Sequence, residues 1–154
     1  MAKLIFNNQV NTEGTFMKIF ANDAEVNIWM NGRISENYKI IDYSASLTNV
    51  ILGKTLIRSF DDNNNINTLD VPEIAQDGEK ITTSENYDNF VKEHLYKIEA
   101  AMGGWPNWPS KTEWQSYITS IKNMTKPSSF PMTVVFPDYV NSQGLTYKSS
   151  LQLP

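Results

Sequence analysis

The first 82 residues contain short runs of β-branched and aromatic side chains separated by polar turn residues, a pattern typical of short β-strands. Residues 15–20 and 26–30 are two such runs. The dipeptide Asn31-Gly32 follows the second run and suits the positive φ angles of a type I′ turn. We therefore predict a hairpin that turns at Asn31-Gly32 and returns through residues 38–41.

The longest apolar stretch spans residues 47–60 and is interrupted by Gly53. A glycine inside a strand pattern indicates a bulge or a change of direction. Residues 61–65 are all Asp or Asn, which predicts a loop. A second hairpin is predicted at Asp77-Gly78, where a two-residue turn would place Ile74 opposite Ile81.

Two amphipathic helices are predicted next, joined by a short segment. The first covers about residues 84–102, with Ser84 as its N-cap and Gly103 ending it. Its apolar stripe has helical spacing and consists of Tyr87, Val91, His94, Leu95, Ile98 and Met102.

The second helix covers about residues 111–125. Ser110 and Glu113 have the spacing of a capping box, in which each side chain accepts a hydrogen bond from the other's backbone amide. Pro109 and Trp114 have the spacing of a hydrophobic staple. The buried stripe predicted for this helix consists of Trp114, Tyr117, Ile118 and Ile121.

These elements predict an α+β fold. An antiparallel β-sheet or sandwich would be built from about residues 1–82 plus 130–140, with the pair of helices packed on it. A chain of 154 residues fits one domain, which we place at residues 1–140. Residues 141–154 are polar and have little apolar surface for docking, so an extended C-terminal arm is predicted there.

Composition narrows the possible functions. The chain has no cysteine, which excludes disulfides, thiolate zinc sites and a cysteine nucleophile. Its net charge is −4 and its 13 Lys and Arg residues are dispersed, so no nucleic-acid partner is expected. No apolar stretch approaches the roughly 20 residues needed to cross a bilayer, and the first residues do not resemble a signal peptide. We therefore expect no membrane partner and a cytoplasmic location in the producing cell.

No residue pattern indicates a catalytic, cofactor-binding or metal site. Gly53-Lys54-Thr55 resembles the end of a P-loop, but Thr48 stands where the first glycine belongs. Residues 61–67 resemble a calcium loop with Ile66 in place of the glycine, which favours a solvated turn and leaves a different calcium site open. His94 is the only histidine and lies on the apolar stripe of a helix, so we expect it to pack in the core. The chain is expected not to be an enzyme.

Residues 103–109 form a Trp-Pro segment, Gly-Gly-Trp-Pro-Asn-Trp-Pro, between the two predicted helices. The favoured interpretation is that the segment connects the two helices and that its indoles, Trp105 and Trp108, close the core. The same indoles, held by prolines, also suit a protein contact or a platform for sugars. The candidate protein-contact residues are Trp105, Trp108, Tyr139, Tyr147, Leu151 and Leu153.

In general character the chain resembles small virion structural proteins of tailed bacteriophages, such as capsid decoration, neck or tail components. It is cysteine-free, Asn-rich, acidic and β-dominated, with an extended terminus predicted. No motif carries this resemblance, so it assigns no residues. The resemblance implies a non-enzymatic subunit without cofactors. Such a subunit would bind other protein subunits or form a homo-oligomer, and it would pass from the cytoplasm into the virion. The alternative is a carbohydrate-binding module that uses Trp105 and Trp108, which would need both indoles exposed on one surface.

Overall fold

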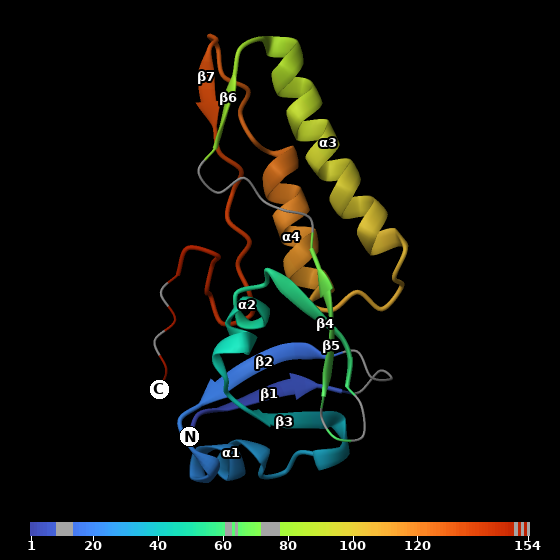
Figure 1. Ribbon diagram of the computed structural model, residues 1–154, viewed down its shortest axis with the longest axis vertical. Coiled ribbons are helices and arrows are strands. Elements are labelled where there is room, and N and C mark those ends of the chain that lie inside the picture. Colours follow the sequence, from blue (N-terminus) through green and yellow to red (C-terminus); the bar gives the residue numbers. More distant parts are fainter. Residues whose placement is uncertain are drawn as a thin grey trace.

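The computed structural model of the chain describes residues 1–8, 14–60, 63, 65–71, 78–149, 151 and 153. This part of the chain has four α-helices and antiparallel sheets, which confirms the predicted α+β class. Within these described residues the strands form three separate small sheets rather than one sheet or sandwich. The molecule is elongated, with one sheet at one end and a pair of helices at the other (Figure 1).

The sheet at the first end has the strand order β2-β1-β3. Its strands are β1 (Lys3–Asn7), β2 (Thr15–Phe20) and β3 (Tyr38–Asp42). Side chains alternate across β1, so Ile5 packs against helix α1 (Asp23–Met30) while Leu4 and Phe6 face the opposite way. Both faces of this sheet are therefore covered, and the middle of its central strand is buried.

Residues 26–30 belong to helix α1, so the predicted strand and hairpin there are wrong. The Asn22 side chain accepts a hydrogen bond from the Glu25 amide at 3.0 Å, and the Glu25 carboxylate accepts one from the Ala21 amide at 3.1 Å. These bonds satisfy amides at the start of the helix and outweigh the β-propensity of the residues that follow. Gly32 follows the helix with a φ of 79°, and β3 pairs with β1 instead.

The apolar stretch 47–60 divides into a helical turn and a strand. The short helix α2 (Thr48–Ile51) follows a 3-10 turn (Ala45–Leu47), and the strand β4 (Thr55–Phe60) begins after Gly53. Gly53 has a φ of 81° and marks the predicted change of direction. β4 forms a hairpin with β5 (Ile66–Asp70), a strand that the sequence pattern did not predict. The calcium-loop prediction depends on residues 61, 62 and 64, which lie outside the described part of the chain.

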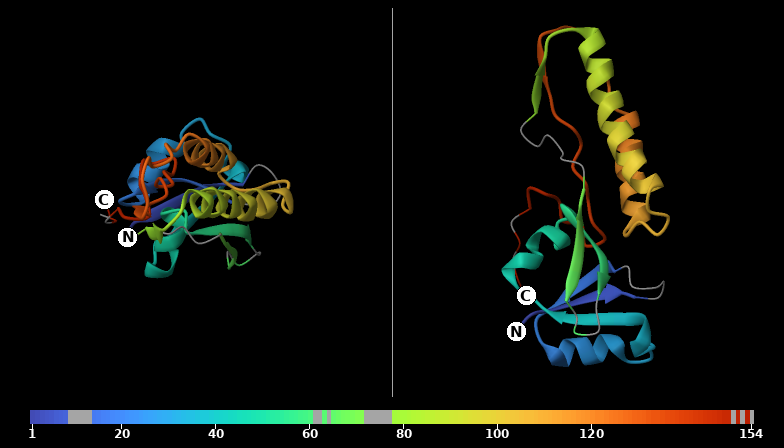
Figure 2. Two further views of the ribbon diagram at one scale, coloured as in Figure 1. Left: turned by 90° about the horizontal axis from the view of Figure 1, so that it is seen from above. Right: turned by 45° about the vertical axis from the view of Figure 1, so that its right-hand side comes forward.

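The other end of the molecule contains helix α3 (Ser84–Gly103), helix α4 (Lys111–Lys122) and the strand pair β6 (Glu79–Ile81) and β7 (Met132–Val134). The two helices lie side by side (Figures 1 and 2). Both predicted helices are thus confirmed, although Thr83 rather than Ser84 caps α3 by accepting the Asn86 amide at 3.1 Å. The hairpin predicted at Asp77-Gly78 lies partly outside the described residues, because these include neither Ile74 nor Asp77. Ile81, the predicted partner of Ile74, pairs with Met132.

The start of α4 does not have the predicted capping box. Ser110 adopts a left-handed conformation, with φ 53° and ψ 40°, and its side chain caps no helix amide. Its side chain lies near the Tyr139 phenol instead, and its backbone N–H donates to Thr15 Oγ1 at 3.4 Å. The tertiary contacts of Ser110 therefore override a local cap that the sequence spacing favoured.

The described residues after Val140 fold back on the chain and do not form an extended arm. From β7 the chain returns past α4 to the region of α2 (Figure 1). There the Asn141 side chain donates to the Ile51 carbonyl, the Ser142 hydroxyl donates to the Phe16 carbonyl at 3.2 Å, and the Gln143 amide donates to the Met17 carbonyl. The segment docks through polar side chains that hydrogen-bond backbone groups of α2 and β2. The prediction of an arm considered only the apolar content of the segment and so missed these contacts.

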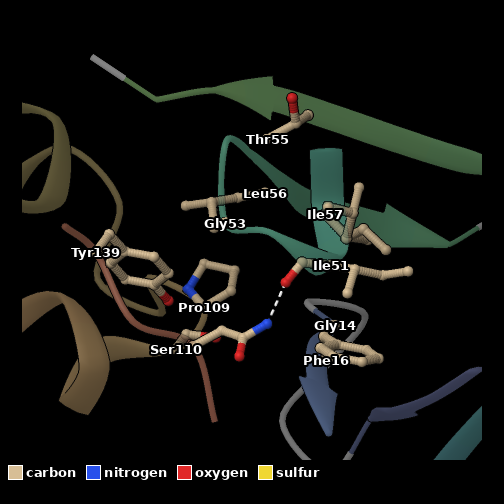
Figure 3. Close-up of a pocket in the computed structure, with 12 residues that line it drawn as sticks. Gly14, Phe16, Ile51, Gly53, Thr55, Leu56, Ile57, Pro109, Ser110 and Tyr139 are labelled. Carbon is tan, nitrogen blue, oxygen red and sulfur yellow. Dashed lines mark hydrogen bonds between the residues drawn. The ribbon is translucent and has the colours of Figure 1, made fainter. Parts of the chain in front are cut away.

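The two ends of the molecule meet around Tyr139. Its ring lies against Gly53, which has no side chain (Figure 3). It also lies beside Trp114, with ring centroids 4.6 Å apart. A small cavity of about 10 Å³ lies next to this contact, lined by β2, α2, β4 and the residues around Pro109. That volume is close to the space of one water molecule, so the junction is tightly packed.

Candidate protein-contact surfaces

Three of the six predicted contact residues lie in the core. Trp108, Tyr139 and Tyr147 have exposed fractions of 3%, 1% and 5% and belong to one cluster with Trp114. Trp108 and Trp114 pack edge to face with ring centroids 5.9 Å apart. The structure thus brings the predicted aromatic residues together, but it uses them to join the helices to β4 and to the C-terminal segment.

Trp105 is the half-buried indole of the Trp-Pro segment. It packs edge to face on Trp108, with centroids 5.8 Å apart, and the Arg58 guanidinium of β4 lies 5.8 Å from its ring. A sugar platform requires both indoles on one surface, and the burial of Trp108 does not meet that requirement. The geometry of residues 103–109 agrees with the interpretation favoured first, an interhelix connection whose indoles close the core.

The two leucines near the C-terminus differ in their surroundings. Leu151 is half-buried and packs against the cluster between the β2-β1-β3 sheet and α2. Leu153 is 45% exposed. Trp105, Leu151 and Leu153 therefore remain at least partly at the surface, and their role as protein contacts stays a prediction.

His94 packs in the core between the two helices, as predicted. Its exposed fraction is 6%, its ring stacks on Phe136 with centroids 4.1 Å apart, and its Nε2 lies 2.9 Å from the Tyr117 hydroxyl. Burial lowers the pKa of His94 to about 4, and the positive charge of Lys97 acts in the same direction. Burial likewise raises the pKa of Tyr117, so both partners are neutral near pH 7.

The described residues contain neither a cluster of metal ligands nor a helix that could span a membrane. Within those ranges, no three His, Asp or Glu side chains lie close enough together to hold a metal ion. None of the helices described has both the length and the apolar composition needed to span a bilayer.

One apolar groove lies between α3 and α4, which we call the α3–α4 groove. It has a volume of about 500 Å³. Tyr96, on its rim, is 73% exposed. The groove is lined by Tyr87, Asp88, Val91, Lys92, Leu95, Tyr96, Glu99, Ile121, Lys122 and Met124.

Charged side chains surround the apolar floor of this groove. Lys122 on α4 pairs with Glu99 on α3 at 3.2 Å, and Lys126 pairs with Asp88 at 2.9 Å. Lys92 lies between these pairs along α3 and makes no ion pair with any described residue. The rim therefore carries both signs of charge, and Lys92 has no ion-pair partner in the described part of the chain.

A second groove lies at the opposite end of the molecule, between α1 and the edge strand β2; we call it the α1–β2 groove. Its volume is about 370 Å³, and Ile28 on its rim is 77% exposed. The Arg33 guanidinium covers the Trp29 ring at 3.7 Å, and Lys18 lies 5.1 Å from the Phe20 ring. This surface combines an exposed aliphatic side chain with cations that lie over aromatic rings.

The sequence contained a signal for both grooves, namely one large apolar side chain outside the buried face of each helix. The six candidate residues did not include these two side chains. Tyr96 falls off the inner apolar stripe of α3, and Ile28 falls away from Val26, the buried residue of α1. Single exposed apolar side chains are common, but these two border apolar grooves, which makes each a candidate contact. The predicted contact residues were placed in the aromatic Trp-Pro segment and in residues 139–153 instead.

Comparisons with protein-family models, with curated proteins and with solved structures find no match. Function is therefore inferred from the surfaces of this chain.

Proposed function

We propose that the chain is a non-enzymatic subunit of a larger protein assembly, such as a capsid decoration, neck or tail component of a tailed bacteriophage. The observation that supports this proposal is the presence of two apolar grooves at opposite ends of an elongated molecule. They are the α3–α4 groove and the α1–β2 groove. The helix pair α3 and α4 lies at one end of the molecule, and α1 and β2 lie at the other (Figure 1).

Each groove presents a large apolar side chain to solvent. Tyr96 and Ile28 are more than two thirds exposed, at 73% and 77%, although each lies beside half-buried apolar neighbours. Transfer of such side chains from water into a contact is favourable by about 1.5–3 kcal/mol each when burial is complete. Exposed apolar surface of this kind, with polar and charged residues around it, is typical of protein–protein interaction sites.

The separation of the grooves favours an assembly over a simple pair. Two surfaces that do not overlap allow one subunit to contact two neighbours at the same time, which rings, tubes and shells require. The core around Trp114 and Tyr139 joins the two ends tightly, so the grooves are held at a fixed spacing. A rigid subunit of this kind transmits a constant geometry from one neighbour to the next.

The test is the native mass of the chain in the material that produces it. We expect most of the chain to sediment with a particle many times its own mass of 17.6 kDa. A native mass equal to one chain, with no co-purifying protein, contradicts the proposal.

A variant pair locates the contact. Ile28→Asp places a charge in the α1–β2 groove and should reduce recovery of the chain in the particle at least about tenfold. Asn27→Asp adds the same charge to the neighbouring exposed residue without removing an apolar side chain, so it serves as the control. Equal recovery of the two variants would show that the α1–β2 groove is not a contact.

A further inference from the structure

The side of α3 that borders the α3–α4 groove carries a stripe of residues that are exposed except for Leu95, which is half-buried and packs against the core. Its members are three or four residues apart, so they lie one above the next along the helix. Tyr96 and Leu95 occupy its middle, with charged residues on either side. The stripe consists of Asp88, Lys92, Leu95, Tyr96, Glu99 and Gly103.

This stripe is complementary to itself when reversed. A two-fold axis that passes between Leu95 and Tyr96, perpendicular to the helix, brings Leu95 of one copy opposite Tyr96 of the other. The same axis brings Lys92 opposite Glu99 of the second copy, twice over. An antiparallel pair of α3 helices in this register therefore places opposite charges together on both sides of an apolar centre.

The charges involved are available for such a contact. Lys92 is exposed and has no ion pair with a described residue. Glu99 pairs with Lys122 at 3.2 Å, and its side chain is still 52% exposed. Lys92 of a second copy would approach Glu99 from the exposed side. Glu99 would then pair with two lysines, Lys122 of its own chain and Lys92 of the second copy.

The two ends of the stripe also fit together, because a residue with a side chain in one copy faces a glycine in the other. The same register brings Asp88 of one copy opposite Gly103 of the other, near the C-terminal end of α3. A Cβ atom added to Gly103 would have no neighbour within 4 Å, so the backbone is uncovered there. The helix can therefore approach closely at both ends, and Tyr96 of each copy meets the α3–α4 groove of the other.

We propose that the α3–α4 groove binds a second copy of this chain, through an antiparallel α3–α3 contact with the two-fold axis between Leu95 and Tyr96. This inference rests on the proposed assembly function and names the partner for one of its two surfaces. The α1–β2 groove is then left for a different neighbour. Because α3 is 20 residues long, or about 30 Å, the contact is small and the dimer is expected to dissociate in the micromolar range.

The experiment is sedimentation equilibrium of the purified chain, with charge-reversal variants. The unmodified chain should form dimers. Lys92→Glu should weaken the dimer at least about tenfold because the introduced carboxylate would face Glu99 of the second copy, and Glu99→Lys should do the same. The double variant Lys92→Glu, Glu99→Lys reverses both partners and should restore dimerisation.

The matched controls are Lys97→Glu and Glu93→Lys, which make the same charge changes on exposed positions of α3 outside the stripe. Both should leave the dimer unchanged, and circular dichroism of every variant should show an intact fold. A chain that is monomeric near millimolar concentration overturns the inference. So does a dimer that the stripe variants do not weaken, or one that the double variant does not restore.

The outcome for this inference is separate from that for the assembly function. A monomeric purified chain that still sediments with a particle contradicts the α3 contact and leaves the assembly proposal standing. A two-fold dimer that associates with nothing else contradicts the assembly proposal and leaves the α3 contact standing.

Discussion

The Nε2 atom of His94 lies 2.9 Å from the hydroxyl oxygen of Tyr117, and this hydrogen bond joins α3 to α4 inside the core. Phe136 stacks on the imidazole, so the histidine contacts both the second helix and the chain that returns from β7. The only histidine of the chain therefore connects three parts of the helical end.

Stability should fall as the pH is lowered through the range in which His94 titrates. The pKa of this histidine is lowered from 6.5 to about 4 in the folded state, so folding favours the neutral ring. Its contribution is complete above pH 6.5 and decreases as the pH falls toward 4, because the unfolded chain then binds the proton more readily. The loss should be on the order of 2–3 kcal/mol at pH 4.

Urea denaturation at several pH values measures this effect. Carboxylates also titrate near pH 4, so the quantity to compare is the pH dependence of the unmodified chain against that of His94→Gln. The variant should be less stable at pH 7 but should lose less stability between pH 6.5 and 4. Parallel curves would show that His94 has an ordinary pKa in the folded protein.

Gly53→Ala should destabilise the protein by about 2–4 kcal/mol. Gly53 has a φ of 81°, and an added Cβ would overlap the Tyr139 ring in the core (Figure 3). Gly144→Ala is the control, because Gly144 has a φ of 77° but open space around its Cβ, so it should cost about 1 kcal/mol. Thermal unfolding of both variants separates the backbone effect from the contact with Tyr139; equal losses would show that this contact is unimportant.

The helical end of the fold could be predicted from the sequence because its signal is long. The apolar spacing of α3 continues along a helix of 20 residues, and such a pattern has few alternatives. Residues 26–30 were predicted wrongly because a short run of β-branched and aromatic residues fits a strand equally well. The Asn22–Glu25 cap was present in the sequence and would have distinguished the two.

The burial of Trp108 could not be predicted from the Trp-Pro segment alone. Local sequence indicates that the segment joins two helices, but the direction of each indole depends on residues far along the chain. Tyr139 and Tyr147 return from β7 to cover Trp114 and its neighbours, and that return depends on polar contacts such as those of Asn141. The surfaces left uncovered, including the rim around Tyr96, follow from this long-range packing.

Asn141→Ala should destabilise the protein by about 1–3 kcal/mol. Its side chain donates to the buried Ile51 carbonyl and accepts hydrogen bonds from the amides of Gln143 and Leu145, both at 2.9 Å. Removal of the side chain takes these hydrogen bonds away from the backbone groups. Asn107→Ala, at an exposed asparagine, is the control and should change the free energy of unfolding by less than about 0.5 kcal/mol. If the two variants are equally stable, the C-terminal segment does not depend on this network.

Trp108→Ala and Trp105→Ala should differ strongly in stability. Trp108 is buried against Trp114, so its removal leaves a cavity at the centre of the aromatic cluster and should cost about 3–5 kcal/mol. Trp105 is half-buried and contacts Trp108 and Arg58 from outside, so its removal should cost roughly 1–2 kcal/mol. Urea denaturation monitored by the remaining tryptophans measures both. If Trp108→Ala is as stable as the unmodified chain, Trp108 is not a core residue, and the Trp-Pro segment becomes available again as a binding surface.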